Sequence, residues 1–224
     1  MATPIGHALA GLAVSSLIYR NDELPEAYNL KARPGGSKIQ KLLYNRGAIA
    51  LLSVFMAMAP DLDLIPGILQ GQPILYHGGI AHSLGSGILL SLLVVALWRT
   101  AWQRVNGRWF VLEGTLGFIF TTSLLAFSTH LLLDMLGPDG REPFGIPALR
   151  PLSEARFLSP IPILLGVHHA SKTTAAFAEF LNGVFSLHNM IAILWESVLT
   201  VPFILLGERR IRQRRSQTTI NAYS

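Results

Sequence analysis

The sequence contains no cysteine and few charged residues. Without cysteine, disulfide bonds and thiolate metal ligands are excluded, so a metal site would have to use histidine, aspartate or glutamate. Charged residues make up 14% of the 224 residues, against about 25% in a typical soluble domain, and hydrophobic residues make up 50%. This composition is typical of a membrane protein rather than of a soluble domain.

The chain also lacks several features that would indicate other classes of protein. Its net charge is +5, but the basic residues lie between apolar runs without the interleaved aromatic residues of a nucleic-acid surface, so we expect no nucleic-acid partner. The first apolar stretch has no basic region before it and carries His7, so we expect no cleavable signal peptide. No internal repeat or low-complexity segment is evident.

Five apolar segments are present, and the last four alternate with polar connections. They cover residues 4–19, 47–59, 84–98, 110–136 and 183–207. The first is short for a membrane span, which needs about 20 residues. The pattern predicts an all-α, multi-pass membrane bundle of about five apolar helices, with a long loop after residue 136. We expect one membrane-embedded domain over residues 1–208 and a basic, disordered tail over residues 209–224.

Basic residues cluster at alternate ends of the apolar segments, in residues 20–46, 99–108 and 209–215. Because positive charge favours the cytoplasmic side, we expect these ends to be cytoplasmic and the protein to lie in the inner membrane. The C-terminus would then be cytoplasmic. Every candidate metal ligand falls at the opposite ends, so the sequence predicts one site on the outer face.

His130 and Asp134 lie four residues apart in the fourth apolar segment. This spacing is about one helical turn, so the imidazole and the carboxylate lie on the same face of a helix and are able to share one ion. The alternative is a local hydrogen bond between them that only holds the end of the helix.

Two further pairs lie at the ends of neighbouring segments. Asp61 and Asp63 follow an apolar helix and Pro60, and in an extended segment their side chains would point the same way. The alternative is ordinary polarity at a helix end. His77 and His82 flank a Gly-Gly pair before the third segment, where both imidazoles would be able to reach one ion.

Two single histidines complete the set of candidates. His7 begins the first segment, where a lone histidine is more often a satisfied structural residue, and His188 begins the last. Eight ionisable residues at one membrane face are more than independent structural roles would give, and we therefore assign them to one site.

Four motifs in chain order carry a resemblance to a known family. They are PIGHALAG (residues 4–11), APDLD (59–63), HGGIAHS (77–83) and HLLLD (130–134). Together they resemble a bacterial family of inner-membrane metal-dependent hydrolases, once classed as a domain of unknown function and distantly similar to zinc phospholipase C and P1 nuclease. The resemblance covers roughly residues 4–160 and implies a set of metal ligands: His7, Asp61, His82, His130 and Asp134, supported by Asp63 and His77. Asp139 and the turn at residues 143–145 also follow the family pattern.

The chain departs from that family at three positions. Gly78 stands where members commonly have an arginine, which removes an anion-binding group. Arg150 stands in a loop where members commonly have a tryptophan. Ala192 follows His188 by four residues, so the second H-x-x-x-E pair of zinc phospholipases is missing and we expect one or two ions rather than three.

These observations predict a membrane-bound hydrolase that uses a divalent metal, with Zn²⁺ as the expected ion, to activate water. Asp61, Asp63 and Asp134 are the candidates for general base. Arg141 and Arg150 would bind a phosphate-bearing lipid or envelope substrate, and membrane lipids are the expected partners; the sequence gives no oligomeric state. Two alternatives remain open: a non-catalytic scaffold with a structural metal, and a transporter, which fits less well because the candidate ligands lie at helix ends.

Overall fold

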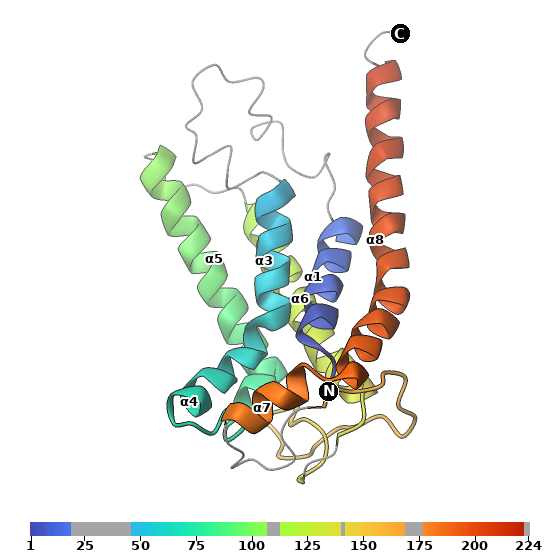
Figure 1. The fold of residues 1–224 in the computed structure, drawn as a ribbon. Helices are drawn as coiled ribbons and strands as arrows, with labels where there is room; N and C mark the ends of the chain where they lie inside the picture. Colours follow the sequence, from blue (N-terminus) through green and yellow to red (C-terminus); the bar gives the residue numbers. More distant parts are fainter. Residues whose placement is uncertain (19–45, 107–112, 140–141, 169–176, 222–224) are drawn as a thin grey trace.

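The computed structural model describes residues 1–18, 46–106, 113–139, 142–168 and 177–221. The α-helices are α1 (Pro4–Ile18), α3 (Arg46–Met58), α4 (Leu64–Leu69), α5 (Leu84–Asn106), α6 (Glu113–Leu136), α7 (Phe177–Val184) and α8 (Leu187–Asn221). Two short 3₁₀ turns, η2 (Ala59–Asp63) and η3 (Ile80–His82), lie between them. The described residues form no β-strand, which confirms the prediction of an all-α bundle with about five apolar helices (Figure 1).

Four helical stretches are long and apolar enough to cross a membrane, namely residues 46–69, 84–101, 116–136 and 187–213. Each contains at least 18 residues, which at 1.5 Å per residue approaches the roughly 30 Å thickness of the hydrocarbon core. Helix α1 has 15 residues and is therefore only about 22 Å long. The chain is a multi-pass membrane protein in which the first helix is shorter than the others.

Helix α1 lies in the centre of the bundle, where it packs against α8, α3 and α6 (Figure 1). Two glycines allow its backbone to approach its neighbours closely. A Cβ atom on Gly11 would lie 2.5 Å from the carbonyl oxygen of Ser53, and one on Gly207 would lie 2.5 Å from the carbonyl oxygen of Ser16. The small residues of α1 therefore bury it among α3, α6 and α8.

The segment around Pro60 differs from the prediction of a helix end followed by an extended strand-like segment. Helix α3 does end at Met58, but the chain continues directly through η2 into α4. Proline is well tolerated in the first turn of a helix, because the N–H that it lacks has no partner there. Asp61 and Asp63 consequently lie on one turn of 3₁₀ helix instead of in an extended segment, yet both carboxylates approach Nδ1 of His77, at 3.9 and 2.9 Å.

Helix α8 continues beyond the expected domain boundary at residue 208 as far as Asn221, so residues 209–221 are helical where we expected disorder. Arginine and glutamine are good helix formers, and no glycine or proline follows Gly207, so the helix has no reason to end there. The polar connection at residues 20–45 lies outside the described residues.

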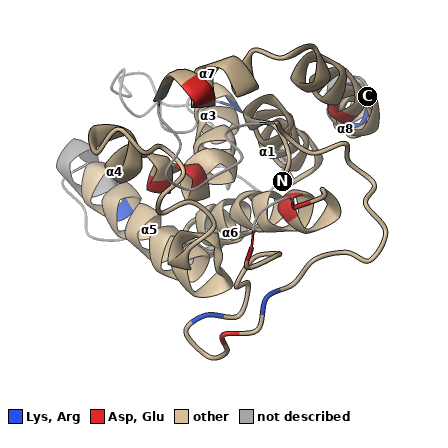
Figure 2. Ribbon diagram, turned by 60° about the horizontal axis from the view of Figure 1, so that its bottom comes forward, with Lys and Arg blue, Asp and Glu red and all other residues tan. Residues whose placement is uncertain are grey.

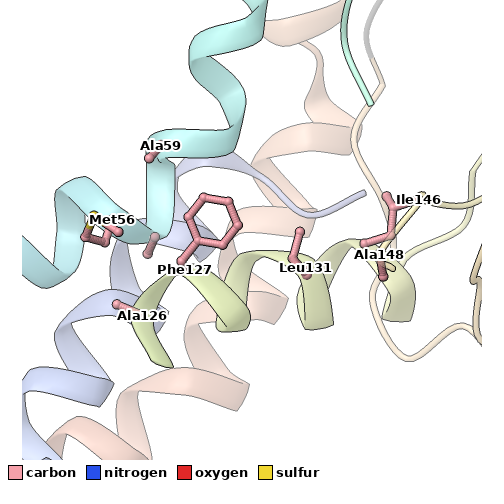
Figure 3. Close-up of a cluster of buried hydrophobic side chains, with 8 residues drawn as sticks. Met56, Ala59, Ala126, Phe127, Leu131, Ile146 and Ala148 are labelled. Atoms are coloured by element: carbon pink, nitrogen blue, oxygen red, sulfur yellow. The ribbon is translucent and has the colours of Figure 1, made fainter. Parts of the chain in front are cut away.

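A small hydrophobic core fixes the long loop against the helices (Figure 3). Met56 on α3 and Phe127 and Leu131 on α6 pack against Ile146 and Ala148 of the loop. Backbone hydrogen bonds secure this contact, because Ile146 pairs with Phe157 across the loop and Leu84 donates to the Ala148 carbonyl at 2.9 Å. The loop after α6 is thus a packed part of the fold.

The two ends of the bundle differ in composition. Figure 1 shows the C-terminal ends of α1, α5 and α8 at one end, together with the start of α3. The N-terminus, α4, α7 and the loop at residues 142–168 lie at the other end. Figure 2 looks onto this second end, where several of the Asp and Glu residues, coloured red, lie beside α4 and near the N-terminus.

Candidate metal centre

Seven of the predicted site residues come together where α1, η2, η3 and α6 meet. His7 comes from α1, Asp61 and Asp63 from η2, and His130 and Asp134 from α6. The remaining two are His77, which lies just before η3, and His82 at its end. Four elements that are separate in the sequence therefore contribute imidazoles or carboxylates to one cluster.

Four atoms form the centre of this cluster. The Nε2 atom of His82 lies 3.7 Å from Oδ1 of Asp61 and 3.5 Å from Oδ2 of Asp134. The Nε2 atom of His130 lies 3.5 Å and 3.3 Å from the same two oxygens. Ligands about 2.0–2.2 Å from a zinc ion lie about 3.3–3.6 Å apart at the corners of a tetrahedron. Three of the four separations fall within this range and the fourth is slightly longer, so the atoms are spaced as two imidazole and two carboxylate ligands of one ion would be.

Three of these four atoms are buried and make no hydrogen bond: Nε2 of His82, Nε2 of His130 and Oδ2 of Asp134. A buried polar atom without a partner normally costs about 1–3 kcal/mol, so three such atoms aimed at one point are unusual. The chemistry of the set, two imidazoles and two carboxylates, fits a divalent cation such as Zn²⁺.

The backbone sets the orientation of His130. Its Nδ1 atom lies 2.7 Å from the carbonyl oxygen of Ala57. Since a carbonyl oxygen only accepts hydrogen bonds, Nδ1 carries the proton and Nε2 presents its lone pair to the centre. A bond of this kind to the distal nitrogen is the usual way in which proteins fix the tautomer of a histidine ligand.

Asp63 supports the two histidines that flank the Gly-Gly pair. Its Oδ1 atom lies 2.9 Å from Nδ1 of His77, and its Oδ2 atom lies 3.1 Å from Nδ1 of His82. The backbone N–H of Gly78 also donates to Asp63 at 3.2 Å. Asp63 thus contacts Nδ1 of His82, while the Nε2 atom of that ring faces the centre.

His7 contacts the centre through Asp134. Its Nε2 atom lies 3.3 Å from Oδ1 of Asp134, and its ring stacks on that of His130 with the centroids 3.7 Å apart. The N–H of Ala2 donates to the same Oδ1 atom at 3.0 Å. Asp134 therefore uses one oxygen to hold the start of the chain and directs the other towards His82 and His130.

The electrostatics of the cluster favour a positive charge. Burial lowers the pKa of the His82 imidazole, but the carboxylates of Asp61 and Asp63 outweigh this effect and raise the pKa to about 10. The carboxylates around His82 therefore stabilise a cation at this place, whether it is a proton on the ring or a metal ion beside it.

The structure places the other sequence candidates away from this cluster. His188 stacks on His168 and contacts the carbonyl oxygen of Gly166 at 3.0 Å. Arg150 is paired with Glu154 on the surface. Asp139 accepts a hydrogen bond from the backbone N–H of Gly145 at 2.9 Å, and Arg141 lies outside the described residues.

A second buried carboxylate, Glu196 on α8, holds the start of α1. It accepts hydrogen bonds from the backbone N–H of Thr3 at 3.0 and 3.1 Å and another from the Thr3 hydroxyl. The Thr3 hydroxyl in turn accepts from the N–H of Gly6 at 2.9 Å. An acid inside an apolar segment was a visible signal, but nothing in the sequence identified Thr3 as its partner.

A cavity of about 340 Å³ adjoins the cluster at His77. Gly78, Gly79 and the loop residues Glu142 and Arg156 form other parts of its wall. The cavity is large enough for a small ligand, and it borders the cluster at His77.

Comparison with known proteins gives one match. The model of a family described as YdjM inner membrane protein matches residues 1–212. No curated protein and no solved structure matches the chain.

Proposed function

The chain belongs to the YdjM inner membrane protein family, and from this premise we propose that it is a membrane-bound, metal-dependent hydrolase. One observation carries the proposal. Four imidazole and carboxylate atoms on three elements lie 3.3–3.7 Å apart, and three of them are buried without a hydrogen bond. Such a group is costly to bury unless a cation completes it.

His82, His130 and Asp134 would hold the ion, and Asp61 would lie at the fourth corner of this inner four, the position that a water molecule would take. Zn²⁺ is the favoured ion because the set combines imidazole with carboxylate and the separations suit tetrahedral coordination. When bound, such an ion supplies Lewis acidity and lowers the pKa of a coordinated water from near 16 to about 7.

One ion fits the donors better than two. Nε2 of His130 belongs to the inner four, and its Nδ1 atom is bonded to the Ala57 carbonyl, so this ring has no nitrogen left for a second ion. Nδ1 of His77 is likewise engaged by Asp63. His7 would act by packing against His130 and by holding Asp134, rather than as a ligand of the same ion.

The three carboxylates have different parts in this proposal. Asp134 is buried, and Asp63 holds His77 and His82, so both serve mainly to position other groups. The side chain of Asp61 is 17% exposed, the largest exposure among the inner four. Asp61 is therefore the member of the inner four best placed to give up its position to a water molecule and to accept that water's proton.

The proposed topology places the C-terminus in the cytoplasm and the site on the outer face. Arg46, Arg99 and the arginines after Gly207 belong to the bundle end opposite the loop and α4 (Figure 1). Positive charge of this kind favours the cytoplasmic side. Reporter fusions after Ser216 and after Asp139 should report opposite sides of the membrane, and reports from the same side would contradict this topology.

The proposed substrate class is a phosphoester or phospholipid-like molecule of the cell envelope, supplied from the membrane. The test is hydrolysis of a phosphodiester substrate by the purified protein in detergent, with and without chelation and readdition of zinc. Asp61→Asn should lower the rate at least about 100-fold, whereas His188→Ala should leave it unchanged. A metal-loaded protein whose ion has only protein ligands by X-ray absorption would overturn the enzyme and indicate a scaffold with a structural metal.

A further inference from the structure

The cavity beside His77 has a charge pattern that selects a particular kind of ligand. Its volume of about 340 Å³ is at the lower end of the roughly 300–1,000 Å³ range of small-molecule sites. His77 lines the cavity and is bonded to Asp63, which also contacts His82. A ligand in this space would thus lie next to the proposed metal centre, and the inference rests on the function proposed above.

Arg156 is the one arginine or lysine among the described residues that line this cavity. Its guanidinium is held by the backbone, since Nε donates to the Gly145 carbonyl at 2.9 Å and Nη2 donates to the Gly78 carbonyl at 3.1 Å. Arginine has five N–H donors, so these two bonds leave donors for a ligand. A half-buried guanidinium fixed in this way is pre-organised to bind a phosphate.

Gly78 keeps the space beside Arg156 open. Its φ angle is +76°, a conformation that favours glycine, and a Cβ atom there would lie 3.8 Å from Nη2 of Arg156. No side chain from this position stands between the guanidinium and His77. Arg156 therefore supplies the positive charge beside the centre, although it is far from the Gly-Gly pair in the sequence.

The cavity also presents negative charge. Glu142 and Asp139 line it together with Arg156 and Met1, whose terminal ammonium group donates to the Pro138 carbonyl at 2.9 Å. A phosphate that pairs with Arg156 would leave a carboxylate in the wall to be matched by a second, positive group of the ligand. A ligand with both a phosphate and an amine would match it, and the half-exposed ring of Tyr76 in the same wall offers a face for the amine.

We propose that this cavity binds an amine-bearing phosphate headgroup, with Arg156 contacting the phosphate and Glu142 contacting the amine. Two residues that line the cavity, Gly79 and Pro143, are each followed in the sequence by an exposed apolar residue. These are Ile80, which is 62% exposed, and Phe144, which is 52% exposed. They would contact the acyl chains of a lipid. The amine-bearing phosphate could belong to a zwitterionic lipid or to a soluble compound, and the experiment separates these sources.

The first part of the experiment measures binding with two small probes whose carbon–phosphorus bond resists hydrolysis. The full-length protein in detergent is titrated by calorimetry with 2-aminoethylphosphonate and with ethylphosphonate, which lacks the amine. The amine-bearing probe should bind at least about 10-fold more tightly, and Glu142→Gln should remove most of this preference. Equal binding of the two probes, or binding of neither, would overturn the proposal.

Two matched arginine variants test the phosphate contact. Arg156→Gln should weaken both probes about 10-fold or more, as expected for the loss of a charged hydrogen-bonding group. Arg150→Gln changes an arginine that is paired with Glu154 on the surface and should alter binding by less than twofold. Because Arg156 also holds the loop, Glu142→Gln on the exposed wall provides a variant that leaves these backbone contacts intact. Equal effects of the two arginine variants would overturn the role of Arg156.

The lipid arm exposes the protein to an equal mixture of phosphatidylethanolamine and phosphatidylglycerol and counts the lipids that it retains. Enrichment of phosphatidylethanolamine that is lost in Glu142→Gln supports a lipid source, and no enrichment overturns it in favour of a soluble amine-bearing phosphate. Metal content and hydrolysis are measured separately. Selective binding without hydrolysis would contradict the proposed function alone, whereas metal-dependent hydrolysis that is indifferent to Arg156→Gln would contradict this inference alone.

Discussion

His130 on α6 donates a 2.7 Å hydrogen bond to the carbonyl oxygen of Ala57 on α3, 73 residues earlier in the chain. Helix α3 ends at Met58, so the Ala57 carbonyl lies in its last turn, where carbonyl groups lack regular α-helical partners. The end of α3 therefore also orients a proposed metal ligand. The change from α3 to η2 accounts for both the position of Asp61 and the direction of the His130 ring.

The first prediction concerns metal occupancy. His130→Ala should lower the zinc content or affinity of the purified protein about 10-fold or more, because it removes one of two imidazoles from the inner four. The measurement is metal analysis after equilibration at a fixed free zinc concentration. His188→Ala, which removes a histidine outside the cluster, is the control and should leave occupancy unchanged. Equal occupancy in both variants would contradict the site.

Asp63→Asn provides a second, graded prediction. The amide keeps the shape of the side chain but loses the charge that acts on the Nδ1 atoms of His77 and His82. Removing such a supporting carboxylate typically costs 10–100-fold in metal affinity, so we expect a loss smaller than that of a true ligand. Competition with a fluorescent zinc chelator measures it. A loss larger than that of Asp134→Asn would assign Asp63 as a direct ligand instead.

The packing of α1 predicts opposite signs for two glycine substitutions. Gly11→Ala should destabilise the protein by about 1–3 kcal/mol, because the new Cβ would lie 2.5 Å from the Ser53 carbonyl oxygen and would push α1 away from α3. Gly117→Ala on α6 meets nothing within 4 Å and should stabilise by up to about 1 kcal/mol through helix propensity. Thermal unfolding in detergent compares the two. An unchanged or raised unfolding midpoint for Gly11→Ala would argue against a close α1–α3 contact.

Thr3→Val tests the link between α1 and α8. The substitution conserves shape but removes the hydroxyl that bonds to Glu196 and accepts from Gly6, so we expect a loss of about 1–2 kcal/mol. Thr100→Val is the control, since its hydroxyl is exposed and contacts only its own helix at Leu97. The unfolding midpoint should fall for Thr3→Val and change little for Thr100→Val. An unchanged midpoint in both would show that Glu196 does not anchor α1 through this hydroxyl.

Local patterns were sufficient to predict much of the fold and of the cluster. Apolar runs identified the helices, and the four-residue spacing of His130 and Asp134 placed both on one face of α6 as expected. The error at Asp61 and Asp63 arose because proline was taken to end the helix, whereas it is compatible with the first turn of a new one.

Contacts that involve the backbone or distant segments were not predictable from one sequence. The Ala57 carbonyl and the Ala2 N–H carry no side-chain signal, and every residue has such groups. His188 resembled the other candidates because it begins an apolar helix, yet its position follows from how residues 142–168 pack rather than from helix direction. Arg156 reaches Gly78 across 78 residues, which only the packed loop determines.

The anchoring of α1 by Glu196 has a consequence for the order in which the protein is synthesised. All seven cluster residues lie between His7 and Asp134, so they emerge from the ribosome before any part of α8. Helix α1 is too short to be held firmly by the bilayer alone, and the carboxylate that fixes its first turn is at residue 196. The cluster residues are thus synthesised before Glu196, the residue that fixes the start of α1. We therefore expect the proposed site to be completed only after the last helix has inserted, and a chain stalled before α8 to carry all seven residues without the contact that fixes α1.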